Sequence, residues 1–141
     1  MEVANGKLRA LQTLWDEKRG DRDMPARGDL AVQTLRPWLG NLALIDLRDG
    51  RAIFRLCGTN LHGRFGGEMT RREIATLDDT IAGTLRRCID QVRASRKPAQ
   101  TKYKAEVAGF PTIFHEICLP LADDGVSMDT LLFASYAEQR K

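Results

Sequence analysis

The sequence predicts an α+β domain, because helical and strand-like patterns occupy separate stretches of its 141 residues. Apolar residues recur at helical spacing at the start of the chain and again in its middle. β-like runs form a pair before that middle and a group of three after it. Strands that do not alternate with helices exclude a doubly wound parallel sheet. A chain of this length favours one domain with a core of its own.

Composition bounds the class of protein. Hydrophobic residues make up 43% and charged residues 29% of the chain, with a mean hydropathy of -0.35, as in ordinary globular proteins. No run approaches the roughly 18 apolar residues that a membrane span requires. The start of the chain also lacks an apolar block followed by a cleavage site. We therefore expect a cytoplasmic protein with no membrane partner.

Residues 1–28 are predicted to form a leading helix and a linker. An apolar stripe recurs there at helical intervals: Ala4, Leu8, Leu11 and Trp15. The helix should end near Gly20. Its stripe must be covered, either by the sheet of the same chain or by a second copy. We expect a homodimer whose interface contains Leu8, Leu11 and Trp15.

Residues 29–141 are predicted to form the domain proper. Asp29 is expected to cap a short helix that Pro37 closes. Two β-like runs follow, Leu42–Leu47 and Ala52–Cys57, and the polar link between them indicates a hairpin.

The second half of the chain continues with helices and then strands. Thr70 and Glu73 have the spacing of a capping box and predict a short helix. A longer helix is expected from about Asp78 to a point before Pro98. Three β-like runs with short turns then predict an antiparallel meander: residues 99–107, 112–121 and 127–136.

A glycine-rich stretch after the second strand raises the question of phosphate binding. Gly58 and Gly63 match the first two glycines of the loop G-x-x-x-x-G-K-[ST]. Arg64 and Phe65, however, stand where that motif needs Lys and then Ser or Thr, so the phosphate clamp and the magnesium ligand are missing. Glycines at this place favour a tight structural corner instead.

No catalytic residue, metal site or enzymatic activity is expected. His115 and Glu116 are adjacent in a predicted strand, so their side chains point to opposite faces and cannot act as a dyad. This segment also lacks the second histidine of the zinc motif H-E-x-x-H, and His62 stands alone. Three widely spaced cysteines are interpreted as reduced core side chains: Cys57, Cys88 and Cys118.

The net charge of +3 is modest but unevenly distributed, because residues 64–104 carry ten basic and five acidic side chains. Only Phe65 and Tyr103 could stack with bases there, so we expect no specific nucleic-acid partner. A solvated helix face explains the charges. An anionic nucleotide site is the alternative, along Arg86, Arg87, Arg93 and Lys97.

Five segments together suggest a family: LW at 14–15, MPARGDL at 24–30, LIDL at 44–47, FRLCGT at 54–59 and LPLADDG at 119–125. With them the chain resembles a PAS domain, and in particular the short, often free-standing bacterial PAS-like proteins with a Trp-bearing leading helix. The resemblance implies a five-stranded antiparallel sheet with helices on one face and the N-terminal helix capping the other.

The resemblance also implies a ligand cavity between the concave sheet and the middle helices. We assign Ile113, His115 and Ile117 to this cavity, because their face of the fourth strand is the more apolar one. The residues expected to contact a ligand are Phe54, Leu56, His62, Leu85, Ile89, Tyr103, His115 and Ile117. The cofactor is unknown, and no spacing singles out an axial ligand for haem.

Two function classes follow. The first is a sensory or regulatory domain that binds a small molecule or a protein partner and signals in trans. The alternative is a ligand-free protein-interaction adaptor with a fully packed core. An enzyme that uses His62 or His115, or a nucleotide binder, has weaker support.

Overall fold

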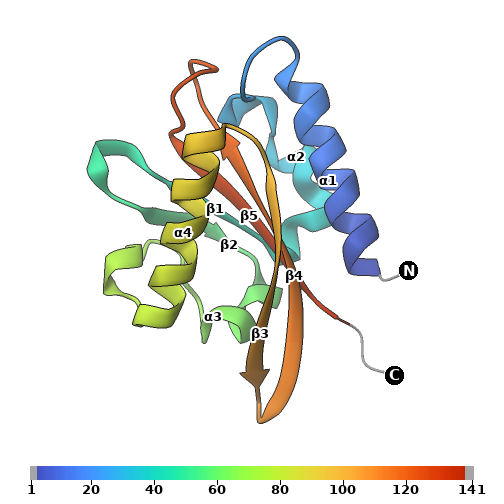
Figure 1. The fold of residues 1–141 in the computed structure, drawn as a ribbon, viewed down its shortest axis with the longest axis vertical. Coiled ribbons are helices and arrows are strands. Elements are labelled where there is room, and N and C mark those ends of the chain that lie inside the picture. The colour runs from blue at the N-terminus through green and yellow to red at the C-terminus, as the bar shows by residue number, and fades with distance from the viewer. Residues whose placement is uncertain (1–2, 139–141) are drawn as a thin grey trace.

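The structure of the chain, a computed structural model, describes residues 3–138 (Figure 1). Its helices are α1 (Val3–Arg19), α2 (Val32–Leu35), α3 (His62–Phe65) and α4 (Asp79–Ser95). Its strands are β1 (Leu42–Asp46), β2 (Ile53–Cys57), β3 (Ala99–Val107), β4 (Phe110–Leu121) and β5 (Thr130–Ala137). Among these residues, none of the helices combines the length and the apolar character needed to span a bilayer.

The five strands form one antiparallel sheet in the order β2-β1-β5-β4-β3. The predicted hairpin and the predicted meander are both present, and β1 joins them by pairing with β5. The α+β class with a five-stranded antiparallel sheet is therefore confirmed. The strands β3 and β2 form the two borders of the sheet.

Both faces of the central strands β1, β5 and most of β4 are buried, each against its own set of helices. The inner face, as we call it, packs under α3 and α4 and carries Phe54, Cys118 and Phe133. The outer face packs under α1 and carries Ile117 and Leu119. Because successive strand residues point to opposite faces, neighbours along β4 enter different cores.

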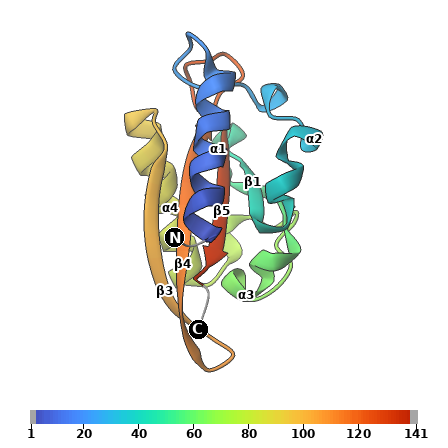
Figure 2. The ribbon, with the colours of Figure 1, turned by 90° about the vertical axis from the view of Figure 1, so that its right-hand side faces the viewer.

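Helix α1 lies across the outer face, over β4 and β5 (Figure 2). Leu11 is fully buried there, and the indole Nε1 of Trp15 donates a hydrogen bond to the Pro120 carbonyl at 2.8 Å. Leu8, Leu11 and Trp15 are thus buried by their own chain. The apolar outer face covers the stripe within the same chain, and the homodimer interface expected at these side chains stays a prediction.

The long middle helix begins as expected. Asp78 is its N-cap, and the Asp78 carboxylate accepts hydrogen bonds from the backbone N–H groups of Thr80 and Ile81. The helix ends at Ser95, before Pro98. Its buried side, which includes Leu85 and Ile89, faces the sheet.

The segment before β1 differs from the prediction. Asp29 closes a 3₁₀ turn, because its carboxylate accepts a hydrogen bond from the backbone N–H of Ala26, and the N-cap of α2 is Ala31. The short helix α2 does end where the proline predicts, because its C-cap is Arg36, directly before Pro37. Pro37 then lies in the first turn of a further 3₁₀ segment, Arg36–Asn41. Proline is compatible with a first turn, where its missing N–H costs no hydrogen bond.

The capping box predicted at Thr70 and Glu73 does not form. The backbone N–H and the hydroxyl of Thr70 both donate to Oε1 of Glu68, at 2.8 and 2.6 Å. Glu73 precedes a short 3₁₀ turn, Ile74–Thr76, as its N-cap residue. The Thr70 N–H that a capping box would pair with Glu73 thus donates to the Glu68 carboxylate instead.

The glycine-rich stretch is a structural corner. A Cβ on Gly58 would collide with the backbone carbonyl groups of Leu39 and Gly40, so two chain segments approach each other at a distance that only glycine allows. Gly66 ends α3 in the left-handed region, with φ of 83°. The corner thereby turns the chain from β2 into α3 and holds Arg64 over the inner face.

Candidate functional site

The expected ligand-binding residues divide between the two faces of the sheet. Phe54, Leu85 and Ile89 belong to the inner core, and Tyr103 also lies on the inner face, since its ring contacts the Arg64 guanidinium. Leu56 and Ile117 pack in the outer core.

The sequence assigned the faces of β4 the wrong way round. Ile117 packs under α1, whereas Cys118 packs under α4. His115 shares the face of Ile117 by strand parity, and pairs with Glu138 through its Nε2 at 3.1 Å from Oε1. Apolar character could not separate the two faces, because helices cover both.

Large side chains occupy the space between the sheet and α4. The Phe54 and Phe65 rings meet edge to face with centroids 5.6 Å apart, and the Phe65 and Phe133 centroids are 5.8 Å apart. Leu85 and Ile89 of α4 pack against this cluster. The space in which the resemblance expected a ligand is therefore filled by the chain itself.

A buried ion pair forms the polar centre of the inner face. The Nε of Arg64 donates to Oε2 of Glu116 at 2.6 Å, and its Nη2 donates to Oε1 at 3.2 Å. The Ser135 hydroxyl donates to the same Oε2 at 2.7 Å. Both charged side chains are about 1% exposed. Two N–H groups and one hydroxyl thus compensate a carboxylate that has lost its water.

The Arg64 guanidinium also contacts aromatic rings. Its central carbon lies 3.8 Å from the centroid of Tyr103 and 5.7 Å from that of Phe114. Arg64 comes from the short helix α3, Tyr103 from β3, and Glu116 from β4. One side chain thereby links the glycine-rich corner to two strands of the sheet.

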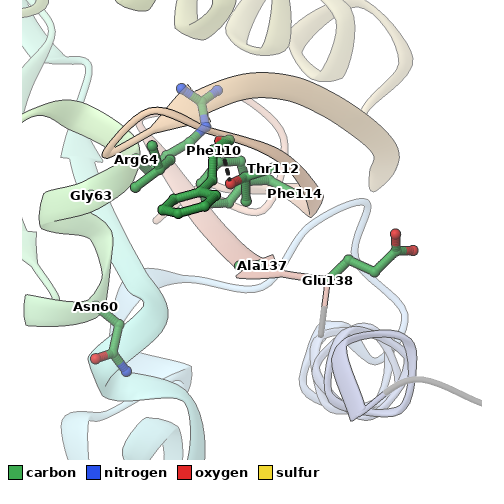
Figure 3. Close-up of a pocket in the computed structure, with 9 residues that line it drawn as sticks. Asn60, Gly63, Arg64, Phe110, Thr112, Phe114, Ala137 and Glu138 are labelled. Carbon is green, nitrogen blue, oxygen red and sulfur yellow. Dashed lines mark hydrogen bonds between the residues drawn. The ribbon is translucent and has the colours of Figure 1, made fainter. Parts of the chain in front are cut away.

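A hollow of about 570 Å³ opens beside this pair, between α3 and the β3–β4 hairpin (Figure 3). Val107, Phe110 and Phe114 give it an apolar wall. Asn60 and Glu138 lie on opposite sides of it, and the guanidinium of Arg64 points away from the Phe110 ring (Figure 3). None of the residues predicted to bind a ligand lines this hollow.

His62, a further predicted ligand residue, lies on α3 and faces Glu68. Its Nε2 is 3.4 Å from Oε2 of Glu68, and both side chains are accessible to solvent. The hydrogen bonds from the Thr70 side chain and backbone lower the pKa of Glu68 from 4.5 to about 2, and His62 adds to this effect. These contacts fix the loop after α3 and provide no inward-facing histidine.

Two of the cysteines meet inside the inner core. The hydrogen bond with Cys88 and burial raise the pKa of the Cys118 thiol well above its ordinary value. Burial likewise raises the pKa of Cys57. Within residues 3–138, no group of three or more His, Cys, Asp or Glu side chains is arranged to hold a metal ion.

The sheet order, the short helices on its inner face and the helix on its outer face define a class of sensory domain. The model of the PAS domain family matches residues 3–133. The chain therefore belongs to the PAS domain family. A comparison with curated proteins finds no match.

Solved structures of PAS and light-oxygen-voltage domains share the fold. A sensory box sensor histidine kinase from Vibrio cholerae aligns with a TM-score of 0.56 and 15% identity, over 82% of this chain and 94% of that one. The PAS domain of a Colwellia psychrerythraea protein aligns with a TM-score of 0.51 and 12% identity, over 74% and 92%. A light-oxygen-voltage domain studied with a flavin analogue aligns with a TM-score of 0.53 and 11% identity, over 78% and 84%.

A flavin does not fit between the sheet and α4 of this chain. The rings of Phe54, Phe65 and Phe133 pack against one another there, and the Arg64–Glu116 pair adjoins them. A planar ring system in the same place would have to displace side chains that are buried and paired. The shared fold therefore does not bring a flavin site with it.

Proposed function

We propose that this PAS domain is a regulatory module that acts in trans through protein contacts and holds no small molecule between its sheet and α4. The observation that carries the proposal is the filled inner face. Phe54 and Phe133 occupy it, and the Arg64–Glu116 pair is satisfied within the chain. Among the described residues, no buried polar side-chain atom lacks a hydrogen-bond partner. The inner face therefore has no unpaired polar group that a ligand would be needed to satisfy.

A small-molecule sensor is the second candidate, and the hollow beside Phe110 favours it. That hollow has the volume of a ligand site and a mainly apolar wall. A ligand there would touch α3 and the β3–β4 hairpin, and so could shift the position of the Arg64 helix. The cytoplasmic location expected from the sequence stays a prediction.

The purified protein tests both candidates. Native mass spectrometry should give the mass of the bare chain, 15.8 kDa for a monomer, and a metabolite library should produce no saturable rise in Tm. A saturable rise that persists in Phe110→Ala but is lost in Leu85→Ala, a variant of the α4 side of the inner core, would place a ligand on the inner face and overturn the main proposal. A rise that Phe110→Ala abolishes would favour the second candidate; Phe110 is 59% exposed, so this variant should fold.

A further inference from the structure

The strand β3 is an open border of the sheet. Its nine residues, Ala99–Val107, pair with β4 along their whole length, and β3 is the last strand in the sheet order. No described segment forms backbone hydrogen bonds to its other side. The strand β3 runs along one side of the molecule beside α4, and its hairpin with β4 extends past the helices at the bottom of the view (Figure 2). Such a border can receive one more strand.

The side chains of this border carry unpaired positive charge. Lys102 and Lys104 are exposed and two residues apart, so they project from the same face of the strand. Within the described part of the chain, neither ammonium group pairs with a carboxylate. Lys97, just before the strand, is exposed and equally without an ion pair.

Surface hollows flank the same border. One of about 260 Å³ adjoins Gln100 and Lys102, where β3 passes Leu8 of α1. Another of about 490 Å³ lies at Lys104 and Glu106. They would accept alternate side chains of an added strand, while its backbone pairs with β3.

We propose that β3 receives an extended, acidic segment of a partner protein by strand addition. Carboxylates at alternate positions of that segment would face Lys102 and Lys104, because the spacing of about 6.8 Å between every second residue is common to all strands. This inference rests on the proposed function, since it names the surface and the kind of partner through which the module acts.

A second copy of this chain fits the border less well. Antiparallel self-pairing centred on Tyr103 sets Lys102 opposite Lys104. Pairing centred on Lys104 sets Lys102 opposite Glu106 but leaves Lys104 opposite its own copy. Like charges directly opposite each other destabilise a strand pair. An acidic segment instead places a carboxylate opposite both lysines, so the border favours an acidic partner over a second copy.

The test uses nine-residue peptides and fluorescence anisotropy at low salt. The probe alternates glutamate with valine; one control replaces glutamate by lysine, and another is the acidic peptide methylated on alternate backbone nitrogens. The acidic peptide should bind, and both controls should fail. The double variant Lys102→Glu, Lys104→Glu should weaken binding about tenfold or more, because two attractive pairs become repulsive. Hydrogen exchange of the β3 amides should slow on binding.

The matched control is a charge reversal on α4, Arg86→Glu with Arg93→Glu, which changes the net charge of the protein by the same amount. Its affinity for the acidic peptide should stay within about twofold of the wild-type affinity. The strand-addition proposal is overturned if the methylated peptide binds as well as its parent, if both charge reversals act equally, or if no peptide binds. It is also overturned if light scattering shows a dimer that forms through β3. If no peptide binds and the purified protein holds no ligand, the strand-addition proposal fails and the proposed function is unaffected. If a ligand is found on the inner face, the proposed function fails whatever the peptides do.

Discussion

Arg64 and Glu116, 52 positions apart in the sequence, form a bidentate ion pair whose two side chains are each about 1% exposed. The pair lies on the sheet face where the resemblance to PAS domains implied a ligand cavity. It joins α3 to β4, and the contact of Arg64 with Tyr103 extends the link to β3. The inner face is thus held by a charge pair as well as by packing.

Removing either partner of this pair should strongly destabilise the fold. Arg64→Met leaves the Glu116 carboxylate buried, and of its donors among the described residues only the Ser135 hydroxyl remains. Loss of one member of a buried ion pair costs about 3–5 kcal/mol. The free energy of unfolding from urea titration measures this cost.

The double variant Arg64→Met with Glu116→Leu is the matched control. It removes both charges together, so it should be more stable than the sum of the two single effects predicts, by at least about 1 kcal/mol. Strict additivity of the single and double variants would show that the two side chains do not depend on each other.

Elements with a local signal could be predicted from the sequence. The aspartate cap at Asp78 and the proline at Pro98 bracket α4, and the turn residues of the last third separate the strands of the meander. The exceptions lie where a nearby group competes, as Glu68 does for Thr70. Capping at a helix start depends on which carboxylate is closest in space, and spacing alone does not decide that.

The candidate site was predicted less well, because its signals are not local. Alternation along β4 separates Ile117 from Cys118 but does not say which helix covers each face when both are buried. The alternation along β4 places Glu116 on the less apolar face of the strand, which predicts exposure to solvent. A single carboxylate within an apolar run is the signal that could have indicated a buried partner, yet nothing in the sequence selects Arg64 from the many arginines.

Acid should weaken the loop after α3 through Glu68. Its folded pKa of about 2 lies below its ordinary 4.5, so its stabilising effect is present above the unfolded value and is lost as pH falls through the folded value. Stability of the wild type should therefore fall between about pH 5 and pH 2 more steeply than that of Glu68→Gln. The comparison is made by thermal unfolding across that range.

Glu17→Gln serves as the control for Glu68, because Glu17 is exposed and makes no hydrogen bond or ion pair among the described residues. Its pH profile should follow the wild type. Identical profiles for Glu68→Gln and Glu17→Gln would contradict the role assigned to the Thr70 hydrogen bonds.

The glycine corner should tolerate substitution at one glycine and not at another. Gly58→Ala places a Cβ against backbone atoms of Leu39 and Gly40, which cannot move aside by rotation about a side-chain bond. We expect a loss of about 2 kcal/mol or more in the free energy of unfolding. Gly63→Ala meets only a Val107 methyl at 3.6 Å, an ordinary contact, and should change stability by less than about 1 kcal/mol. Equal effects of the two substitutions would contradict the close approach at Gly58.

Helix α1 should act as part of the core and not as a dimerisation arm. Leu11 is fully buried against the outer face, so Leu11→Ala should cost about 2–5 kcal/mol, from lost burial and the cavity that remains. Gln12→Ala, one position on and exposed, should cost less than about 0.5 kcal/mol. Because the stripe is used within the chain, Leu11→Ala should leave the molar mass from light scattering unchanged while it lowers the urea midpoint. If Leu11→Ala instead changes the molar mass without lowering the stability, the stripe lies between two chains, as the sequence analysis expected.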